Sequence, residues 1–236
     1  MFYAKRIIGN LRGTFFDKCY ICEANDILGE EEHRIPKSAN ISDENLQDET
    51  NLFWACKKCN GRKGYQFFKV SNECKYGNGY VGIIDCTKCD PNKYIKLKIR
   101  LNDCYKHKIT ISVKNDAPCV KLTICLLNKV YGSKNGMCDN DIDNLKLHIA
   151  QEIRDIDSII DKLHCAVRHG QNEMVINSLK ERIIILLLPN SPFSAFKLTF
   201  VEETYEKAPD SEFKNILSEI LSNPQLHPNA DDTCCS

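Results

Sequence analysis

The segment from residue 19 to residue 64 reads CYICEANDILGEEEHRIPKSANISDENLQDETNLFWACKKCNGRKG, and it decides how the rest of the chain is interpreted. Two Cys-x-x-Cys pairs lie near its ends, Cys19 with Cys22 and Cys56 with Cys59. Each pair can direct two thiolates at one point, and four sulfurs form the tetrahedral set of a structural zinc ion, with Zn–S distances of about 2.3 Å. Disulfides are the alternative, but the chain has no secretory features. We therefore predict one structural zinc ion on these four cysteines.

The residues between the two pairs suit acid–base and metal chemistry. His33 can be neutral near pH 7 and can accept a proton from water. Glu32 and Asn60 offer oxygen donors, which suit Mg²⁺ or Mn²⁺ better than a thiolate site does. Because neighbours on an extended strand point to opposite sides, Glu32 and His33 can serve one site only if the chain bends between them. A lone histidine is more often solvated or packed, but its place beside an acid, within the cysteine frame, favours a catalytic role.

This order of residues resembles the HNH (ββα-metal) endonucleases: Glu32-His33, then Asn51, then Asn60 within a closing Cys-x-x-Cys-Asn-x-x-Lys. The resemblance implies that His33 is the general base and that Glu32 and Asn60 hold a catalytic Mg²⁺ or Mn²⁺. It also implies that Asn51 braces the loop that orients the base. Asn60 stands where many members have His, and its amide oxygen still offers a ligand. The implied fold is α+β, with an HNH core and zinc site followed by a β-hairpin and a helical C-terminal region.

Two later segments resemble one HNH subgroup, the nuclease partner of Septu-type and retron defence systems. They are Asp85 with Asp90-Pro91, and residues 192–196, which read PFSAF. The resemblance implies an effector that cleaves phosphodiester bonds in DNA during antiviral defence, together with a PtuA-like ATPase. In a retron it also implies a reverse transcriptase with its RNA–DNA product.

Composition sets outer bounds on the class of protein. The chain has 236 residues, 32 basic and 32 acidic, so nucleic-acid binding must come from a local patch rather than from net charge. It has 14 cysteines and no N-terminal secretory pattern, and its longest apolar run, 183–188, is too short to span a bilayer. We expect a soluble, reduced, cytoplasmic protein.

Basic residues gather around the second cysteine pair. Residues 50–72 hold five Lys or Arg and no acid, a pattern that can neutralise phosphates without reading sequence. A solvated face is the alternative. The expected nucleic-acid contacts are Arg34, Lys37, Lys57, Lys58, Arg62 and Lys63.

Periodicity predicts the remaining elements. Residues 94–101 and 108–113 alternate apolar and polar side chains, which predicts a hairpin with one wet face, whereas 120–136 fits either a strand or a short helix. Helices are expected over 139–170, 172–188, from 192 onward, and over 210–221, with a lead-in helix or a basic arm over 3–16. The expected segments are 1–72 (nuclease core), 73–136 (hairpin and linking region), 137–222 (helical region) and 223–236 (disordered tail).

Other cysteines and histidines give weaker signals. Cys86 and Cys89 form a third Cys-x-x-Cys, but a second zinc ion would need Cys74, Cys104 or His107 as partners. His164 and Cys165 lie in the predicted long helix, where packing is the expected role. The helical region has amphipathic stripes and no catalytic constellation, so it is a candidate docking surface for the ATPase. The rival function is a non-catalytic, zinc-stabilised adaptor that binds nucleic acid or a protein.

Overall fold

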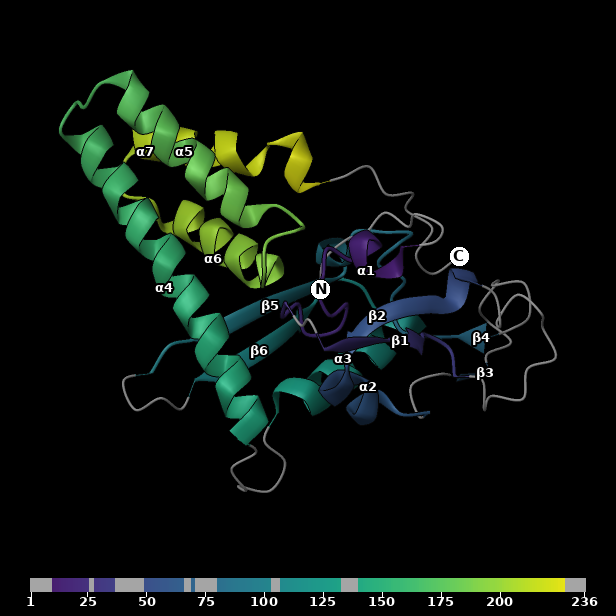
Figure 1. Cartoon of the computed structure of the whole chain (residues 1–236). Helices are drawn as coiled ribbons and strands as arrows, with labels where there is room; N and C mark the ends of the chain where they lie inside the picture. Colours follow the sequence, from purple (N-terminus) through teal and green to yellow (C-terminus); the bar gives the residue numbers. More distant parts are fainter. Residues whose placement is uncertain are drawn as a thin grey trace.

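The computed structural model describes residues 10–25, 28–36, 49–65, 69–70, 80–102, 107–132 and 140–227. It is an α+β protein in which the described strands form three two-stranded antiparallel sheets (Figure 1). The α-helices are α1 (Leu11–Thr14), α2 (Lys57–Lys63), α3 (Pro118–Tyr131), α4 (Asn140–Arg168), α5 (Glu173–Leu187), α6 (Ser194–Lys207) and α7 (Ser211–Leu221). The strands are β1 (Gly29–His33), β2 (Leu52–Cys56), β3 (Lys69–Val70), β4 (Tyr80–Val81), β5 (Ile95–Arg100) and β6 (Lys108–Val113), and the short 3₁₀ helices are η3 (Glu49–Asn51), η4 (Pro91–Lys93) and η5 (Pro224–Leu226).

An antiparallel hairpin runs directly into a helix near the N-terminus. β1 pairs with β2 in a register that sets Glu32 opposite Phe53. Cys56 ends β2 and caps α2, because its sulfur accepts a hydrogen bond from the Cys59 amide at 3.4 Å. Gly64 ends α2 with a φ of +52°, a conformation that glycine adopts without the steric cost of a Cβ. The order β1–β2–α2 therefore places both residues of the second cysteine pair at one corner.

The second hairpin confirms the period-two prediction. Leu97 of β5 pairs with Ile111 of β6, and the inward face of β5 is buried. The other face is exposed at Arg100 and, on β6, at Lys108, Thr110 and Ser112, as expected for a wet face, and α6 lies along only part of it. Lys96 and Lys98 form ion pairs with Glu202 and Glu203 of α6 at 3.1 and 2.6 Å.

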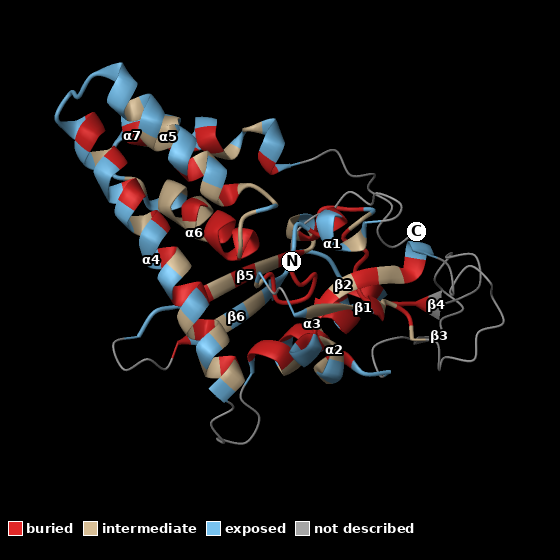
Figure 2. Ribbon diagram, viewed as in Figure 1, coloured by how far each residue is buried: buried red, intermediate tan, exposed pale blue. Residues whose placement is uncertain are grey.

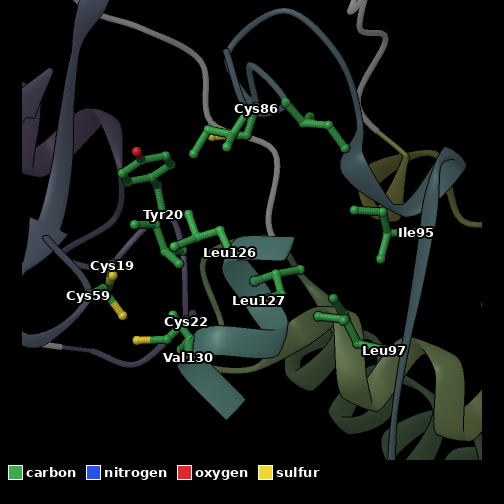
Figure 3. Packing of buried hydrophobic residues seen from close by; sticks show 14 of the residues in the cluster. Cys19, Tyr20, Cys22, Cys59, Cys86, Ile95, Leu97, Leu126, Leu127 and Val130 are labelled. Atoms are coloured by element: carbon green, nitrogen blue, oxygen red, sulfur yellow. The ribbon is translucent and has the colours of Figure 1, made fainter. Parts of the chain in front are cut away.

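The undecided stretch after the hairpin is helical. α3 begins with Pro118 at a permitted first-turn position, and one face of it is buried. Leu126 and Val130 on that face pack beside the cysteine turn (Figure 3). Residues 120–131 therefore belong to a helix rather than to a third strand.

The long C-terminal helices begin and end close to the expected positions. α4 is followed by Gly170 with a φ of +60°, and the Asn172 side chain caps α5 through the Val175 amide at 3.0 Å. The Asp210 side chain caps α7 through the Phe213 amide at 2.7 Å. The expected cap at 139–141 begins outside the described residues, because α4 is described from residue 140 onward.

The prediction of a disordered tail from residue 223 is wrong for its first residues. Pro224–Leu226 form η5, and Leu226 is buried in the helical cluster. This burial extends the packed region by a turn beyond α7. Residues 228–236, including the Cys234-Cys235 pair, lie outside the description.

The buried hydrophobic residues form two clusters; Figure 2 shows the buried residues in red. The second lies among α4, α5, α6 and α7. The first cluster contains residues from each of the expected segments 1–72, 73–136 and 137–222. Its members include Phe15, Phe53, Ile84, Leu97, Leu127, Ile153 and Phe196. The helical region therefore contributes residues to the core that surrounds the cysteine turn.

Buried polar groups join the same regions. The Lys18 ammonium is fully buried and donates to the carbonyls of Pro189 and Ser191 at 2.9 and 2.7 Å. The Glu23 carboxylate accepts from the Ala195 amide at 3.1 Å. The segment beside the first cysteine pair is thus docked on the chain that leads into α6. Of the helices described, none has the length and apolar character needed to cross a membrane.

Candidate metal centre and active site

The structure brings together the four cysteines of the two Cys-x-x-Cys pairs. The Sγ atoms of Cys19, Cys22, Cys56 and Cys59 all lie within 4.8 Å of one another, and all four residues are buried. Cys19 and Cys22 sit on a turn in which the Cys19 carbonyl accepts from the Glu23 amide at 2.9 Å. The Tyr20 amide donates to the Trp54 carbonyl at 3.0 Å, which ties this turn to β2. Four sulfurs gathered in this way can hold a metal ion such as zinc.

The electrostatics of the cluster suit a cation. Hydrogen bonds from Cys19, Cys22 and Cys59 lower the pKa of the Cys56 thiol. Hydrogen bonding to Cys19 is the main cause that raises the pKa of Cys22 and of Cys59. One thiolate is therefore favoured at Cys56, at the start of α2, while Cys22 and Cys59 favour the protonated form. A bound divalent metal would displace those protons, since metal ligation requires thiolates.

Glu32 is directed into the protein rather than toward an open site. Its side chain is 4 % exposed, and one carboxylate oxygen lies 2.8 Å from the Lys63 ammonium. The other oxygen accepts a hydrogen bond from the buried Tyr20 hydroxyl. Burial raises the pKa of Glu32, and Lys63 and Tyr20 oppose that shift. The carboxylate therefore serves two internal partners, one of which is a cation.

His33 lies at the end of β1 and is partly exposed. The strand pairing is regular through this point, since Glu32 faces Phe53 and His33 faces Leu52. The bend that would let Glu32 and His33 share one site is absent, so the two side chains leave the strand on opposite sides. The main chain of His33 is nevertheless held, because its carbonyl accepts from the Lys63 ammonium at 2.7 Å.

Asn60 of α2 meets a different acid from the one expected. Its amide nitrogen lies 2.8 Å from a carboxylate oxygen of Glu30, two residues before Glu32 on the same face of β1. Lys63, one helical turn later, meets Glu32. The predicted pairing of Glu32 with Asn60 around a catalytic Mg²⁺ or Mn²⁺ is therefore not formed, and Glu32, already bound to an ammonium group, does not fit a divalent ion. Glu30 was missed, although strand alternation from Glu32 and helical spacing from Lys63 both point to it.

Asn51 holds the chain just after His33. Its side chain is 3 % exposed and accepts from the Ile35 amide at 2.9 Å while donating to the Ile35 carbonyl at 2.8 Å. The Asn51 carbonyl also accepts from the Arg34 amide at 2.9 Å. These three bonds fix residues 34–35 against the start of β2, which is the geometry that a brace requires.

Two of the expected phosphate contacts are internal. Lys63 is 1 % exposed and fully engaged with β1. Arg34 donates to the Ile83 carbonyl at 2.7 Å and lies 3.7 Å from Asp85, with only 11 % of its side chain exposed. The prediction that Lys63 and Arg34 contact nucleic acid is therefore wrong, because burial keeps both side chains from phosphate.

The remaining basic residues keep their predicted role only in part. Lys57 is exposed and Arg62 is partly exposed on α2. Lys58 is exposed and pairs with Asp141 at 2.8 Å, a surface contact of low strength. Lys37 lies outside the described residues. Lys57, Lys58 and Arg62 thus remain predicted contacts to phosphate.

The third Cys-x-x-Cys does not form a metal site with residues that the structure describes. Cys89 is disulfide-bonded, as is Cys119 of α3, whereas Cys86 is a buried free thiol. Burial is the main cause that raises the pKa of Cys86. Cys74 and Cys104, the other candidates for a second site, lie outside the described residues. The His164 ring stacks on Phe213, which fits the packing role expected for it.

Comparison with known proteins gives no identity. No family model matches the chain, and no curated protein or solved structure matches it either. Function is therefore inferred from the arrangement of this chain's own residues.

Proposed function

We propose that the chain is an HNH-type endonuclease that hydrolyses phosphodiester bonds in DNA, with zinc on its four cysteines. The observation that carries this proposal is the fixed backbone around His33. Lys63 holds the His33 carbonyl and Asn51 holds both polar groups of Ile35, while the side chain of His33 itself is partly exposed. A partly exposed imidazole on an immobilised strand end is suited to accept a proton from an attacking water.

The zinc ion has a structural role in this proposal. The sulfurs come from a turn after α1 and from the junction of β2 with α2, so one ion ties together the two sides of the hairpin. Closed four-cysteine sites leave no open position for substrate, which separates the zinc from the chemistry. His33 is the residue that would activate water, and Lys57, Lys58 and Arg62 would offer positive charge to the phosphate backbone.

The experiment that tests the proposal is cleavage by the purified full chain. Supercoiled plasmid, linear DNA and RNA are incubated with Mg²⁺, with Mn²⁺ and with excess EDTA, and zinc content is measured in parallel. We expect cleavage that requires an added divalent ion while one zinc ion stays bound. Absence of cleavage of all three substrates, both alone and with a co-expressed ATPase, would contradict the proposal.

The second candidate function is a zinc-stabilised adaptor. The burial of Glu32 with Lys63 favours it, because that pair removes the expected ligand of a catalytic ion. An adaptor would bind nucleic acid or protein in the same assay without cutting it.

A defence complex with an ATPase is the proposed setting. Support comes from α5, whose outer surface exposes Met174 by 81 % and Ile185 by 60 %, and exposed apolar side chains are common where proteins dock. Deleting the helical region would not test this setting, because α4 and α6 supply part of the first cluster. Co-purification of the full chain with the ATPase is the suitable measurement.

A further inference from the structure

We propose that Lys63 and Glu32 form a positioning pair for His33, and that Glu32 is not a ligand of a catalytic divalent ion. This inference rests on the proposed nuclease function and reassigns two residues within it. The inference rests on the surroundings of Glu32, because its buried carboxylate is bonded to Lys63 and Tyr20 rather than left open for a metal ion.

The first step concerns the geometry of Lys63. Its ammonium reaches from α2 to β1 and makes two bonds there, to the Glu32 carboxylate at 2.8 Å and to the His33 carbonyl at 2.7 Å. The two acceptors belong to consecutive residues of the strand. One cation thus fixes both the rotation of the strand about Glu32 and the position of the peptide that follows His33.

The second step concerns the role of Glu32. A carboxylate without a partner is costly to bury, and so is an ammonium without one. Here each neutralises the other, and Tyr20 supplies the remaining hydrogen bond. A divalent ion at Glu32 would have to displace the Lys63 ammonium. The ammonium would then lie beside the ion without a carboxylate partner, and the His33 carbonyl would lose its hydrogen bond. Metal binding at Glu32 is therefore incompatible with the observed support of His33.

The third step concerns the direction of the side chains. Regular pairing directs Glu32 toward α2 and directs His33 away from it. Lys63 can therefore act on His33 only through the backbone, and it touches neither the imidazole nor a phosphate. Its role is positioning, and a misplacement of about 1 Å at the base is enough to cost about 100-fold in rate.

The variants that test this inference are Lys63→Met, Glu32→Gln and the double variant that combines them. Lys63→Met leaves the Glu32 carboxylate buried without its cation. The double variant removes both charges but still lacks a donor for the His33 carbonyl. If Lys63 positions His33, the double variant regains thermal stability but keeps a kcat lowered by about 10- to 100-fold, with KM within about twofold of wild type. Full recovery of kcat in the double variant would show a role in charge balance alone and would overturn the inference. Lys121→Met, at a lysine of α3 whose side chain is 64 % exposed and which has no proposed role in binding, is the matched control and should change neither kcat nor thermal stability.

The metal arm uses Mn²⁺ as the probe. Half-saturating Mn²⁺ is measured by electron paramagnetic resonance for wild type, Glu32→Gln and Glu30→Gln. The inference expects Glu32→Gln to bind Mn²⁺ as wild type does. A tenfold weakening in Glu32→Gln would overturn it, since that result identifies Glu32 as a ligand.

A third readout separates this inference from the nuclease proposal. The amide of Arg34 belongs to the peptide whose carbonyl Lys63 holds, so its ¹H–¹⁵N resonance reports that bond without any cleavage. We expect the Arg34 resonance to shift in the double variant and not in Lys121→Met. An unmoved Arg34 resonance refutes the positioning role, whereas a shifted resonance in a protein that does not cut refutes only the proposed function.

Discussion

The side chain of Asn51 offers the sharpest test of how the strand end is held. Truncation to alanine removes an acceptor from the Ile35 amide and a donor from the Ile35 carbonyl, both at normal hydrogen-bond distances. Ile35 is 4 % exposed, so bulk water does not reach either group freely. Two buried backbone groups are left without their partner.

The size of the effect follows from those two groups. Each buried polar group without a partner costs about 1–3 kcal/mol, which gives about 2–6 kcal/mol for the pair. The space vacated by the amide can admit a water that bonds to both groups and offsets part of this cost. We therefore expect Asn51→Ala to lower the free energy of unfolding by about 3 kcal/mol, or about 6–12 °C in Tm for a chain of this size.

An isosteric variant adds a test with a defined sign. Asn51→Asp keeps the acceptor for the Ile35 amide but sets a second carboxylate oxygen against the Ile35 carbonyl. The folded state then favours the protonated acid, whose hydroxyl can donate to that carbonyl, so the pKa of the new carboxyl is raised in the folded state. A raised pKa means that the folded state binds a proton that the unfolded state releases, and stability relative to wild type therefore increases as the pH falls.

The assay is denaturant unfolding at pH 7 and pH 5, with Asn177→Ala on the exposed side of α5 as the control. The control should stay within about 0.5 kcal/mol of wild type. If Asn51→Ala unfolds within 1 kcal/mol of wild type, or if Asn51→Asp loses stability on acidification, the hydrogen bonds described for Asn51 do not support the strand end as argued.

Two further predictions concern metal and pH. Cys56→Ala should lose the bound zinc and most of the folded population, because binding energy at such a site is folding energy, and retention of one zinc ion per chain by mass spectrometry would contradict the site. Burial lowers the pKa of Lys18 to about 8, so the folded protein releases a proton that the unfolded chain keeps until higher pH. The free energy of unfolding of wild type relative to Lys18→Met should therefore increase by about 2 kcal/mol between pH 8 and pH 10. If the difference between the two proteins does not change with pH, the prediction is refuted.

Local signals in the sequence predicted much of the frame. The Cys-x-x-Cys spacing identified the four residues that cluster, because each pair needs only a tight turn to aim two sulfurs at one point. The alternation in 95–100 and 108–113 predicted β5 and β6. The helices expected from residues 172 and 210 are α5 and α7, and the structure shows Asn172 and Asp210 as their caps. These features depend on neighbours within a few residues, which the sequence displays directly.

The roles of charged residues could not be read in the same way. Lys63 and Arg34 were assigned to a solvent-facing patch because lysine and arginine are normally exposed, yet tertiary packing turns both inward. The contacts of Lys18 with Pro189 and Ser191 join residues more than 170 positions apart, and no local sequence pattern predicts them. Strand alternation places Glu30 and Glu32 on one face of β1, but the packing of α2 on that face, which sets Glu32 against Lys63 and Glu30 against Asn60, is a tertiary contact.

The central claim is that His33 acts as the general base of a nuclease, and its replacement by alanine tests this most directly. Cleavage of plasmid DNA is followed under single-turnover conditions for wild type, His33→Ala and the control His169→Ala, whose histidine is exposed in the turn after α4. We expect His33→Ala to keep its zinc and its Tm while the rate falls by about 10²–10⁴-fold, and the control to cut as wild type does. Wild-type cleavage by a folded, zinc-loaded His33→Ala protein would contradict the claim.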